Sequence, residues 1–150
     1  MPSKIEEALA QQKKYRDELW AKPKVNEAYQ GQLESVLPGF NIAIKKAENN
    51  PNNFGVLSQK VSSPDQANKI LNESIENSFW RWLQAGKPVP LVDFMQMRWA
   101  PIGAENDPKN LNMNWAPNVR NFLEQLYGTE QYKKMKQDKI VLKENDTQVA

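Results

Sequence analysis

The sequence predicts an all-α fold, and three observations lead to that prediction. Apolar residues recur at steps of three and four positions, the spacing of one helix face, along most of the 150 residues. Helix start and stop signals, such as Ser63-Pro64 and Gly86, fall at the ends of these patterns. No two segments show the alternation expected of paired strands. A chain of this length supports one modest core, so we expect one globular unit with polar extensions.

The N-terminal part of the sequence is predicted to form two helices that are polar on most of their faces. The apolar positions between Ile5 and Trp20 share one stripe, and Pro23 ends this helix. A weaker helical pattern over residues 25–36 follows, and we expect it to stop at Pro38-Gly39. Residues 1–37 are therefore predicted to form a helical arm that covers the following module or packs on a neighbouring subunit.

Residues 38–128 are predicted to form the central helical module. A short helix from Phe40 to Ala47 leads into ENNPNNFG, whose Asn, Pro and Gly residues exclude regular structure. Ser63 then provides the N-cap of a long helix, with proline at its first position, and Gly86 ends it.

Two shorter helices are expected in the rest of the module. One covers residues 91–99, and the other covers 117–127 and ends at Gly128. The polar segment 102–114 between them has no periodicity and is predicted to be a loop. Residues 129–150 are expected to add one short polar helix and a tail that cannot bury enough surface to order itself alone.

The composition excludes several classes of function. The absence of histidine and cysteine removes the commonest general base, the thiolate nucleophile and every Cys/His zinc site. No glycine-rich phosphate loop is present, and 20 basic against 18 acidic residues do not form the strongly basic surface of a nucleic-acid-binding protein. No apolar stretch approaches the length of about 18 residues that spans a membrane. We expect no cofactor and no metal, because the polar loop over residues 105–110 departs from calcium-binding spacing.

Carboxylate chemistry remains, and Glu48 is the best-placed candidate for it. It follows an apolar helix face and enters an Asn-rich loop. Partial burial against Phe40, Ile44 and Phe54 would favour the neutral acid that protonates a glycosidic oxygen, either beside a second carboxylate or with help from the substrate. The alternative is a solvated glutamate near a helix end, because structural carboxylates outnumber catalytic ones.

Tryptophans on either side of the 102–114 loop are a second candidate feature, because exposed indole faces stack on sugars or partner side chains. The helical stripe predicts that Trp82 lies in the core and Trp80 on the opposite face, where exposure would indicate a contact surface. Arg98, beside Trp99, is either a clamp for loop carbonyl groups or a ligand contact.

The segment from Asn49 to Gly128 resembles the lysozyme-superfamily modules that tailed bacteriophages carry in their virions, described as phage structural proteins with muralytic, peptidoglycan-cleaving activity. The stretches that carry the resemblance are ENNPNNFG, SSPDQANKIL, DFMQMRWAPIGAENDP and NWAPNVRNFL. The resemblance covers about half of the chain and implies a small lysozyme-like helical module. Two positions depart from the family pattern: Asn52 replaces a glycine, and Glu48 directly abuts the loop.

The resemblance also implies a site, in which Glu48 is the catalytic acid of a glycosidase or lytic transglycosylase. The residues implied to contact the substrate are Asn49, Asn50, Asn53, Arg98, Trp99, Asn106 and Asp107. It further implies a virion-associated protein, assembled in the bacterial cytoplasm, whose partners are other virion proteins and peptidoglycan. A non-catalytic structural protein of the particle, which assembles through its terminal arms, is the alternative.

Overall fold

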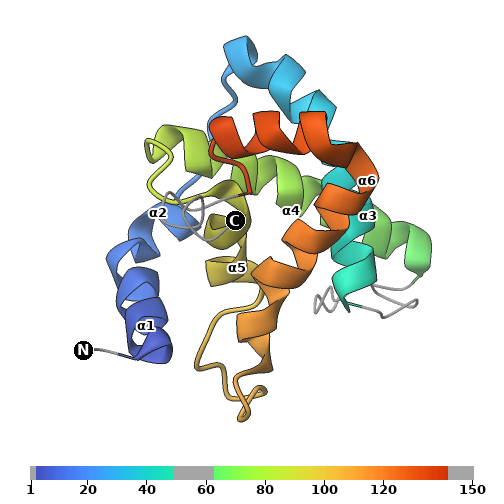
Figure 1. The fold of residues 1–150 in the computed structure, drawn as a ribbon. Helices are drawn as coiled ribbons and strands as arrows, with labels where there is room; N and C mark the ends of the chain where they lie inside the picture. Colours follow the sequence, from blue (N-terminus) through green and yellow to red (C-terminus); the bar gives the residue numbers. More distant parts are fainter. Residues whose placement is uncertain (1–2, 49–62, 142–150) are drawn as a thin grey trace.

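The computed structural model describes residues 3–48 and 63–141, and every regular element within them is helical, which confirms the predicted fold class (Figure 1). The helices, with η marking a 3₁₀ helix, are α1 (Lys4–Lys14), α2 (Arg16–Trp20), η1 (Glu27–Tyr29), α3 (Gln30–Glu48), α4 (Pro64–Gln84), α5 (Leu91–Trp99), η2 (Leu111–Asn114) and α6 (Trp115–Gln137). None of the helices in these two ranges has the length and apolar character needed to traverse a lipid bilayer.

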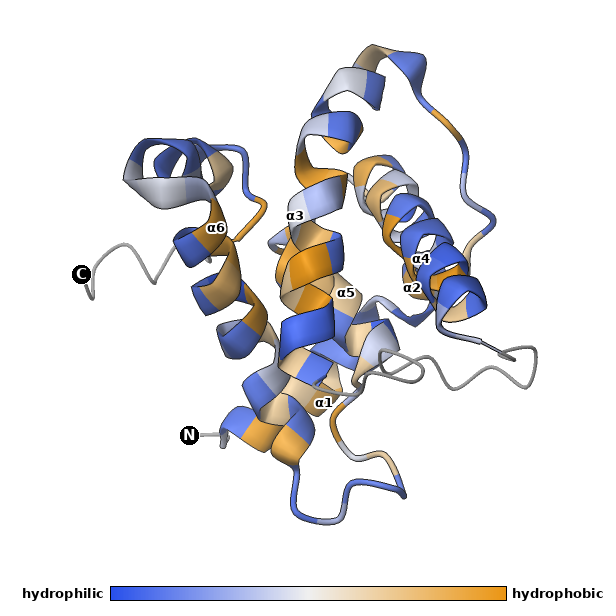
Figure 2. Ribbon diagram, turned by 90° about the vertical axis from the view of Figure 1, so that its right-hand side faces the viewer, coloured by the Kyte–Doolittle hydropathy of each residue, from blue (hydrophilic) through white to orange (hydrophobic). Residues whose placement is uncertain are grey.

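The hydrophobic core lies where α3, α4, α5 and α6 meet. Helix α3 packs most extensively against α6 and also contacts α4, while α5 contacts both α4 and α6. Figure 2 shows hydrophobic residues of α3 and α5 gathered at the centre of the molecule, whereas hydrophilic residues dominate the outer side of α4. The largest fully buried side chains are Trp82, Phe40, Phe79, Phe94, Ile44, Leu71, Ile75, Leu91, Met95, Leu123, Ile140 and Val92.

Several start and stop signals act as the sequence predicts. The Ser63 hydroxyl accepts a hydrogen bond from the backbone N–H of Gln66 at 3.2 Å, so Ser63 is the N-cap of α4. Gly86, just beyond the end of α4, has a φ of +83°. Gly128 has a φ of +73° and divides α6 into two helical segments at a kink, at the position predicted for a helix end.

Helix α1 lies at the edge of the molecule (Figure 1), and none of its residues is buried. Ser3 and Glu6 form a capping box at its start. The helix predicted from Ile5 to Trp20 is interrupted at Tyr15, whose backbone leaves helical geometry. The N-terminal segment is therefore two short helices, and only α2 contributes a core residue, Leu19.

The predicted helix stop at Pro38-Gly39 is wrong, because α3 continues through both residues to Glu48. A proline inside a helix removes one backbone hydrogen bond, but burial of the helix face against α4 and α6 outweighs this loss. Leu33 and Val36, which precede the proline, are 2% and 3% exposed. The boundary predicted after residue 37 thus falls inside one continuous helix whose first half already contributes to the core.

Close approach of α6 explains why glycine follows the proline. Gly39 is buried, and a Cβ atom at this position would overlap the ring of Tyr127. The Tyr127 hydroxyl lies 3.1 Å from the carbonyl oxygen of Ser35 and 3.4 Å from that of Val36, in the turn of α3 disturbed by Pro38. Pro38 provides no N–H for the carbonyl oxygen of Glu34, and the tyrosine hydroxyl contacts the next two carbonyl groups of the helix.

The helical stripe places Trp80 on the face of α4 opposite Trp82, and this face is covered. Trp80 is 4% exposed, and Trp82, as predicted, is fully buried. Trp80 lines a hollow together with Lys24 and Val25, so the segment after α2 lies beside this face of α4. The backbone N–H of Lys24 and the side chain of Gln84 are hydrogen bonded at 3.0 Å, which fixes that segment on the end of α4. Both faces of α4 are therefore covered near its C-terminus.

Residues that follow α6 complete the start of α5. The backbone N–H groups of Leu91 and Val92 donate to the carbonyl oxygens of Lys139 and Ile140, at 3.1 and 3.0 Å. These amides belong to the first turn of α5, which has no side-chain cap. Ile140 and Val141 are buried, so this segment is part of the core.

The burial of Tyr127 predicts that the folded protein becomes less stable at alkaline pH. Burial raises the pKa of Tyr127, and a smaller contact with the backbone of Gly39 acts in the opposite direction. Because the folded protein holds this proton more tightly than the unfolded chain, stability is full below about pH 10, the ordinary tyrosine value, and falls as the pH rises through the raised pKa. Urea unfolding between pH 9 and 11 is expected to show a steeper loss for the wild type than for Tyr127→Phe; equal slopes would contradict it.

Candidate functional site

Glu48 is the last residue of α3 and is partly exposed. Its Oε1 atom accepts two hydrogen bonds, from Nε1 of Trp99 at 2.8 Å and from Nε1 of Trp115 at 3.0 Å. Trp99 ends α5 and Trp115 begins α6. One carboxylate oxygen thus joins the ends of three helices that are distant in the sequence.

The other carboxylate oxygen of Glu48 differs from Oε1 in its contacts with the described residues. Within residues 3–48 and 63–141, Oε2 of Glu48 has no hydrogen-bond partner. Two N–H donors on Oε1 fix the rotation of the carboxyl group, so a proton carried by Glu48 resides on Oε2. Ile44 and Phe40, which precede Glu48 by one and two helical turns, are fully buried. This arrangement orients a carboxyl group at the border of the core.

Gln96 positions Trp115 relative to Trp99. It lies one helical turn before Trp99 on α5, and its side-chain oxygen accepts from the backbone N–H of Ala116 at 3.1 Å. Its side-chain nitrogen donates to the carbonyl oxygen of Asn112 at 2.9 Å. Gln96 could not be identified from the sequence, because an amide in the middle of a helix gives no local sign of a partner 16 or 20 residues away.

The side-chain amide of Gln12 holds the start of the loop that follows α5. Gln12 of α1 accepts from the backbone N–H of Ile102 at 2.7 Å and donates to its carbonyl oxygen at 3.0 Å. Asn112 donates to the carbonyl oxygen of Pro101 at 2.8 Å. These bonds satisfy backbone groups of a polar loop, so the loop keeps a defined path without regular structure.

Two of the predicted substrate contacts differ in burial: Asp107 is buried and Asn106 is exposed. Asp107 is 9% exposed, and its two carboxylate oxygens accept from the backbone N–H groups of Leu111 and Asn112 at 2.9 and 2.8 Å. It therefore stabilises the start of η2. Asn106 is exposed on the loop surface.

Arg98 lies away from Glu48. Its guanidinium group stacks on the ring of Trp20 of α2, with its central carbon 4.3 Å from the ring centroid. The adjacent Trp99 points to Glu48 instead, because consecutive residues of a helix face different directions. Of the predicted site residues described here, the structure brings Trp99 to Glu48 and adds Trp115. The remaining predictions, Asn49, Asn50 and Asn53, lie outside the described residues, as does Phe54.

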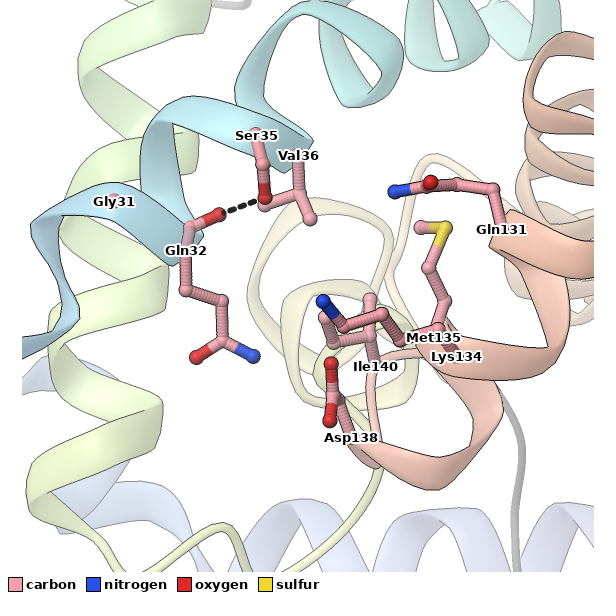
Figure 3. A pocket seen from close by; sticks show the side chains of 9 residues that line it. All are labelled: Gly31, Gln32, Ser35, Val36, Gln131, Lys134, Met135, Asp138 and Ile140. Carbon is pink, nitrogen blue, oxygen red and sulfur yellow. Dashed lines mark hydrogen bonds between the residues drawn. The ribbon is translucent and has the colours of Figure 1, made fainter.

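A cavity of about 350 Å³ lies at the opposite end of α3 from Glu48. Figure 3 shows its lining, with the first half of α3 on one side and the end of α6 with Ile140 on the other. At about 1.5 Å per residue, Val36 in this lining is about 18 Å from Glu48 along the helix. The cavity is therefore separate from the carboxylate. In the described part of the chain, no cluster of three or more acidic residues is arranged to hold a metal ion.

Asp93 of α5 forms an ion pair with Arg120 of α6 at 3.0 Å. Comparison with known proteins identifies no relative, since no protein family, curated protein or solved structure matches this chain. The candidate site therefore consists of Glu48, Trp99 and Trp115, and its assignment depends on its chemistry.

Proposed function

We propose that this chain is a bacteriophage virion protein whose helical module binds and cleaves peptidoglycan, with Glu48 as the general acid. The observation that carries the proposal is the pair of hydrogen bonds from Trp99 and Trp115 to Glu48. The two tryptophans belong to the RWAP and NWAP stretches, and Glu48 opens the ENNPNNFG stretch. Three separate stretches that carry the resemblance to muralytic modules thus contribute to one cluster.

The geometry of the carboxyl group supports proton donation. The indole N–H groups hold Oε1, so Oε2 is the atom that protonates the oxygen of a glycosidic bond as it breaks. Asp93 is engaged with Arg120, and the proposal assigns no second carboxylate to the reaction. The positive charge that develops on the sugar is then stabilised by the substrate itself, which is the route open to a glycosidase or lytic transglycosylase with a single acid.

The test is the release of soluble fragments from dye-labelled, purified sacculi. Glu48→Gln keeps an oxygen that accepts from both indoles and removes the acidic proton, so we expect the rate to fall by a factor of about 100 or more. Glu105→Gln, the same change at an exposed loop position, is the matched control and should keep the wild-type rate. Trp99→Phe removes one donor to Glu48, and its rate should lie between those of the two glutamine variants.

Equal fragment release by the wild type and Glu48→Gln would contradict the catalytic role. Far-UV circular dichroism and urea unfolding of each variant would show whether a lost rate reflects lost folding. Absence of release by the wild type, together with absence of its co-sedimentation with sacculi, would contradict both cleavage and binding.

The exposure of helix α1 supports a second candidate function, a non-catalytic structural role in the particle. An isolated helix of 11 residues is marginally stable in water, yet α1 buries none of its residues and leaves Leu9 43% exposed. A neighbouring subunit would provide the missing apolar surface. In that case trypsin should cleave the isolated protein rapidly after Lys13 or Lys14 and the assembled particle slowly; resistance of the isolated protein would contradict the role.

A further inference from the structure

Two arginines reach the C-terminal end of α2 from different helices. Arg81, in the last turn of α4, donates through Nε to the carbonyl oxygen of Ala21 at 2.6 Å. Arg98, in the last turn of α5, stacks on Trp20. Because Trp20 and Ala21 are consecutive residues, the two guanidinium groups lie against the same short piece of chain.

Neither arginine has an acidic partner in the described parts of the chain. The ion pairs found there join Arg120 to Asp93 and Lys133 to Glu130. Arg81 is 8% exposed, and its Nη1 atom is buried without a hydrogen-bond partner. The Nε atom of Arg98 is likewise buried without a partner. Buried guanidinium donors without acceptors are unfavourable, so this arrangement is incomplete by itself.

The electrostatics agree with that geometry. Burial lowers the pKa of both arginines, and the positive charge of Arg98 lowers the pKa of Arg81 further. Two like charges that are partly removed from water repel each other, and an anion placed between them would relieve both the repulsion and the lost solvation.

Trp20 provides a surface beside the two charges. Its side chain is 65% exposed, which is unusual for so large an apolar group, and it borders an open hollow of about 440 Å³ with Arg16 and Asp17. Arg98 holds the indole in place by stacking on it. An indole held in this way contacts the flat or apolar part of a ligand at little entropic cost.

We infer that Arg81, Arg98 and Trp20 form a binding site for an oxyanion, a carboxylate or phosphate group, carried by a ligand whose flat or apolar part lies on Trp20. We refer to these three residues as the two-arginine site. Guanidinium forks bind both anions through paired N–H donors, so the shared chemistry defines the site. It is separate from Glu48, which Trp99 contacts from the next position of α5, and it does not depend on the proposed cleavage reaction.

Glu18 is an acidic residue of α2 that lies near Ala21, the residue contacted by Arg81. It lies two residues before Trp20, and its Oε2 atom is buried without a partner. It lines a smaller hollow with Ala21 and Gln84. Its negative charge opposes entry of an anion, so removing that charge by Glu18→Gln should tighten anion binding.

The four arginines of the sequence allow a direct test by NMR of the ¹⁵N-labelled full chain. Acetate and phosphate are titrated separately at constant ionic strength, and the side-chain Nε–Hε signals are followed. We expect saturable shifts of the Arg81 and Arg98 signals, with Arg120, which is paired with Asp93, as the internal reference. The stronger of the two anions identifies the group that the site takes. Benzoate should bind more tightly than acetate to the wild type, and this preference should disappear in Trp20→Ala.

Variants and contradicting outcomes complete the test. Arg98→Gln should weaken the binding of either anion by about tenfold or more, because it removes a charge-assisted partner. Lys69→Gln, the same loss of charge at an exposed position of α4, should leave it unchanged. Shifts that are linear and equal at all four arginines would overturn the inference. The inference would also be overturned if Glu18→Gln, without added anion, moved the Arg81 and Arg98 signals in the direction opposite to the shift that anions cause, because Glu18 would then be their partner.

Discussion

Trp82→Ala is expected to lower the free energy of unfolding by about 3–5 kcal/mol, the cost of truncating a large buried aromatic side chain. Trp82 is fully buried and packs on Phe79, with ring centroids 5.8 Å apart. Its Nε1 atom donates to the carbonyl oxygen of Val89 at 2.7 Å, so the ring also holds the turn that leads into α5. Urea unfolding followed by far-UV circular dichroism measures the change independently of tryptophan fluorescence.

Two further substitutions make this result specific. Trp82→Phe keeps most of the ring but leaves the buried Val89 carbonyl without its donor, so a smaller cost of about 1–3 kcal/mol is expected. Trp20→Ala is the same truncation at an exposed position, where we expect about 1 kcal/mol or less. A cost for Trp82→Ala no larger than that for Trp20→Ala would show that Trp82 does not organise the core.

Gly39→Ala is expected to destabilise the protein by about 1–3 kcal/mol, although alanine is the better helix former. A methyl group at this position overlaps the Tyr127 ring, so the ring has to move and its hydroxyl leaves the carbonyl oxygen of Ser35. Gly31→Ala in the same helix is the matched control. No atom lies within 4 Å of a Cβ at Gly31, and that substitution should be neutral or stabilising.

A double-mutant cycle tests the cause. In a Tyr127→Ala background the overlap is absent, so Gly39→Ala should cost nothing or stabilise the protein by up to about 1 kcal/mol. Thermal and urea unfolding of the four proteins measure the coupling. The same loss in both backgrounds would mean that the methyl group meets something other than Tyr127.

Most of the helices could be predicted from the sequence because their signals are local. Ser63 caps the helix that it precedes, and Gly128 breaks the helix in which it lies. The stop predicted at Pro38-Gly39 failed because the need for glycine there comes from a ring 88 positions later, across the α3–α6 contact. The exposure of Trp80 could not be predicted for a similar reason: a stripe shows one buried face, and the cover on the second face comes from the segment after α2.

The candidate site shows the same division between local and distant signals. The position of Glu48 at a helix end followed from the pattern before it. Its partners Trp99 and Trp115 are 51 and 67 positions away, and no periodicity encodes such pairs. The stacking of Arg98 on Trp20 joins residues that are even farther apart in the sequence, so the role of Arg98 stayed open between a clamp for loop carbonyl groups and a ligand contact.

The backbone hydrogen bonds between the first turn of α5 and residues 139–140 affect the order in which the protein folds during synthesis. Leu91 leaves the ribosome 48 residues before Lys139, the residue whose carbonyl group pairs with its amide. Until those later residues emerge, the start of α5 exposes amide groups and apolar side chains to water. The domain therefore completes its fold only after residues 139–141 have been synthesised. In the folded protein, hydrogen exchange at the amides of Leu91 and Val92 reports whether residues 139–141 are packed against the start of α5.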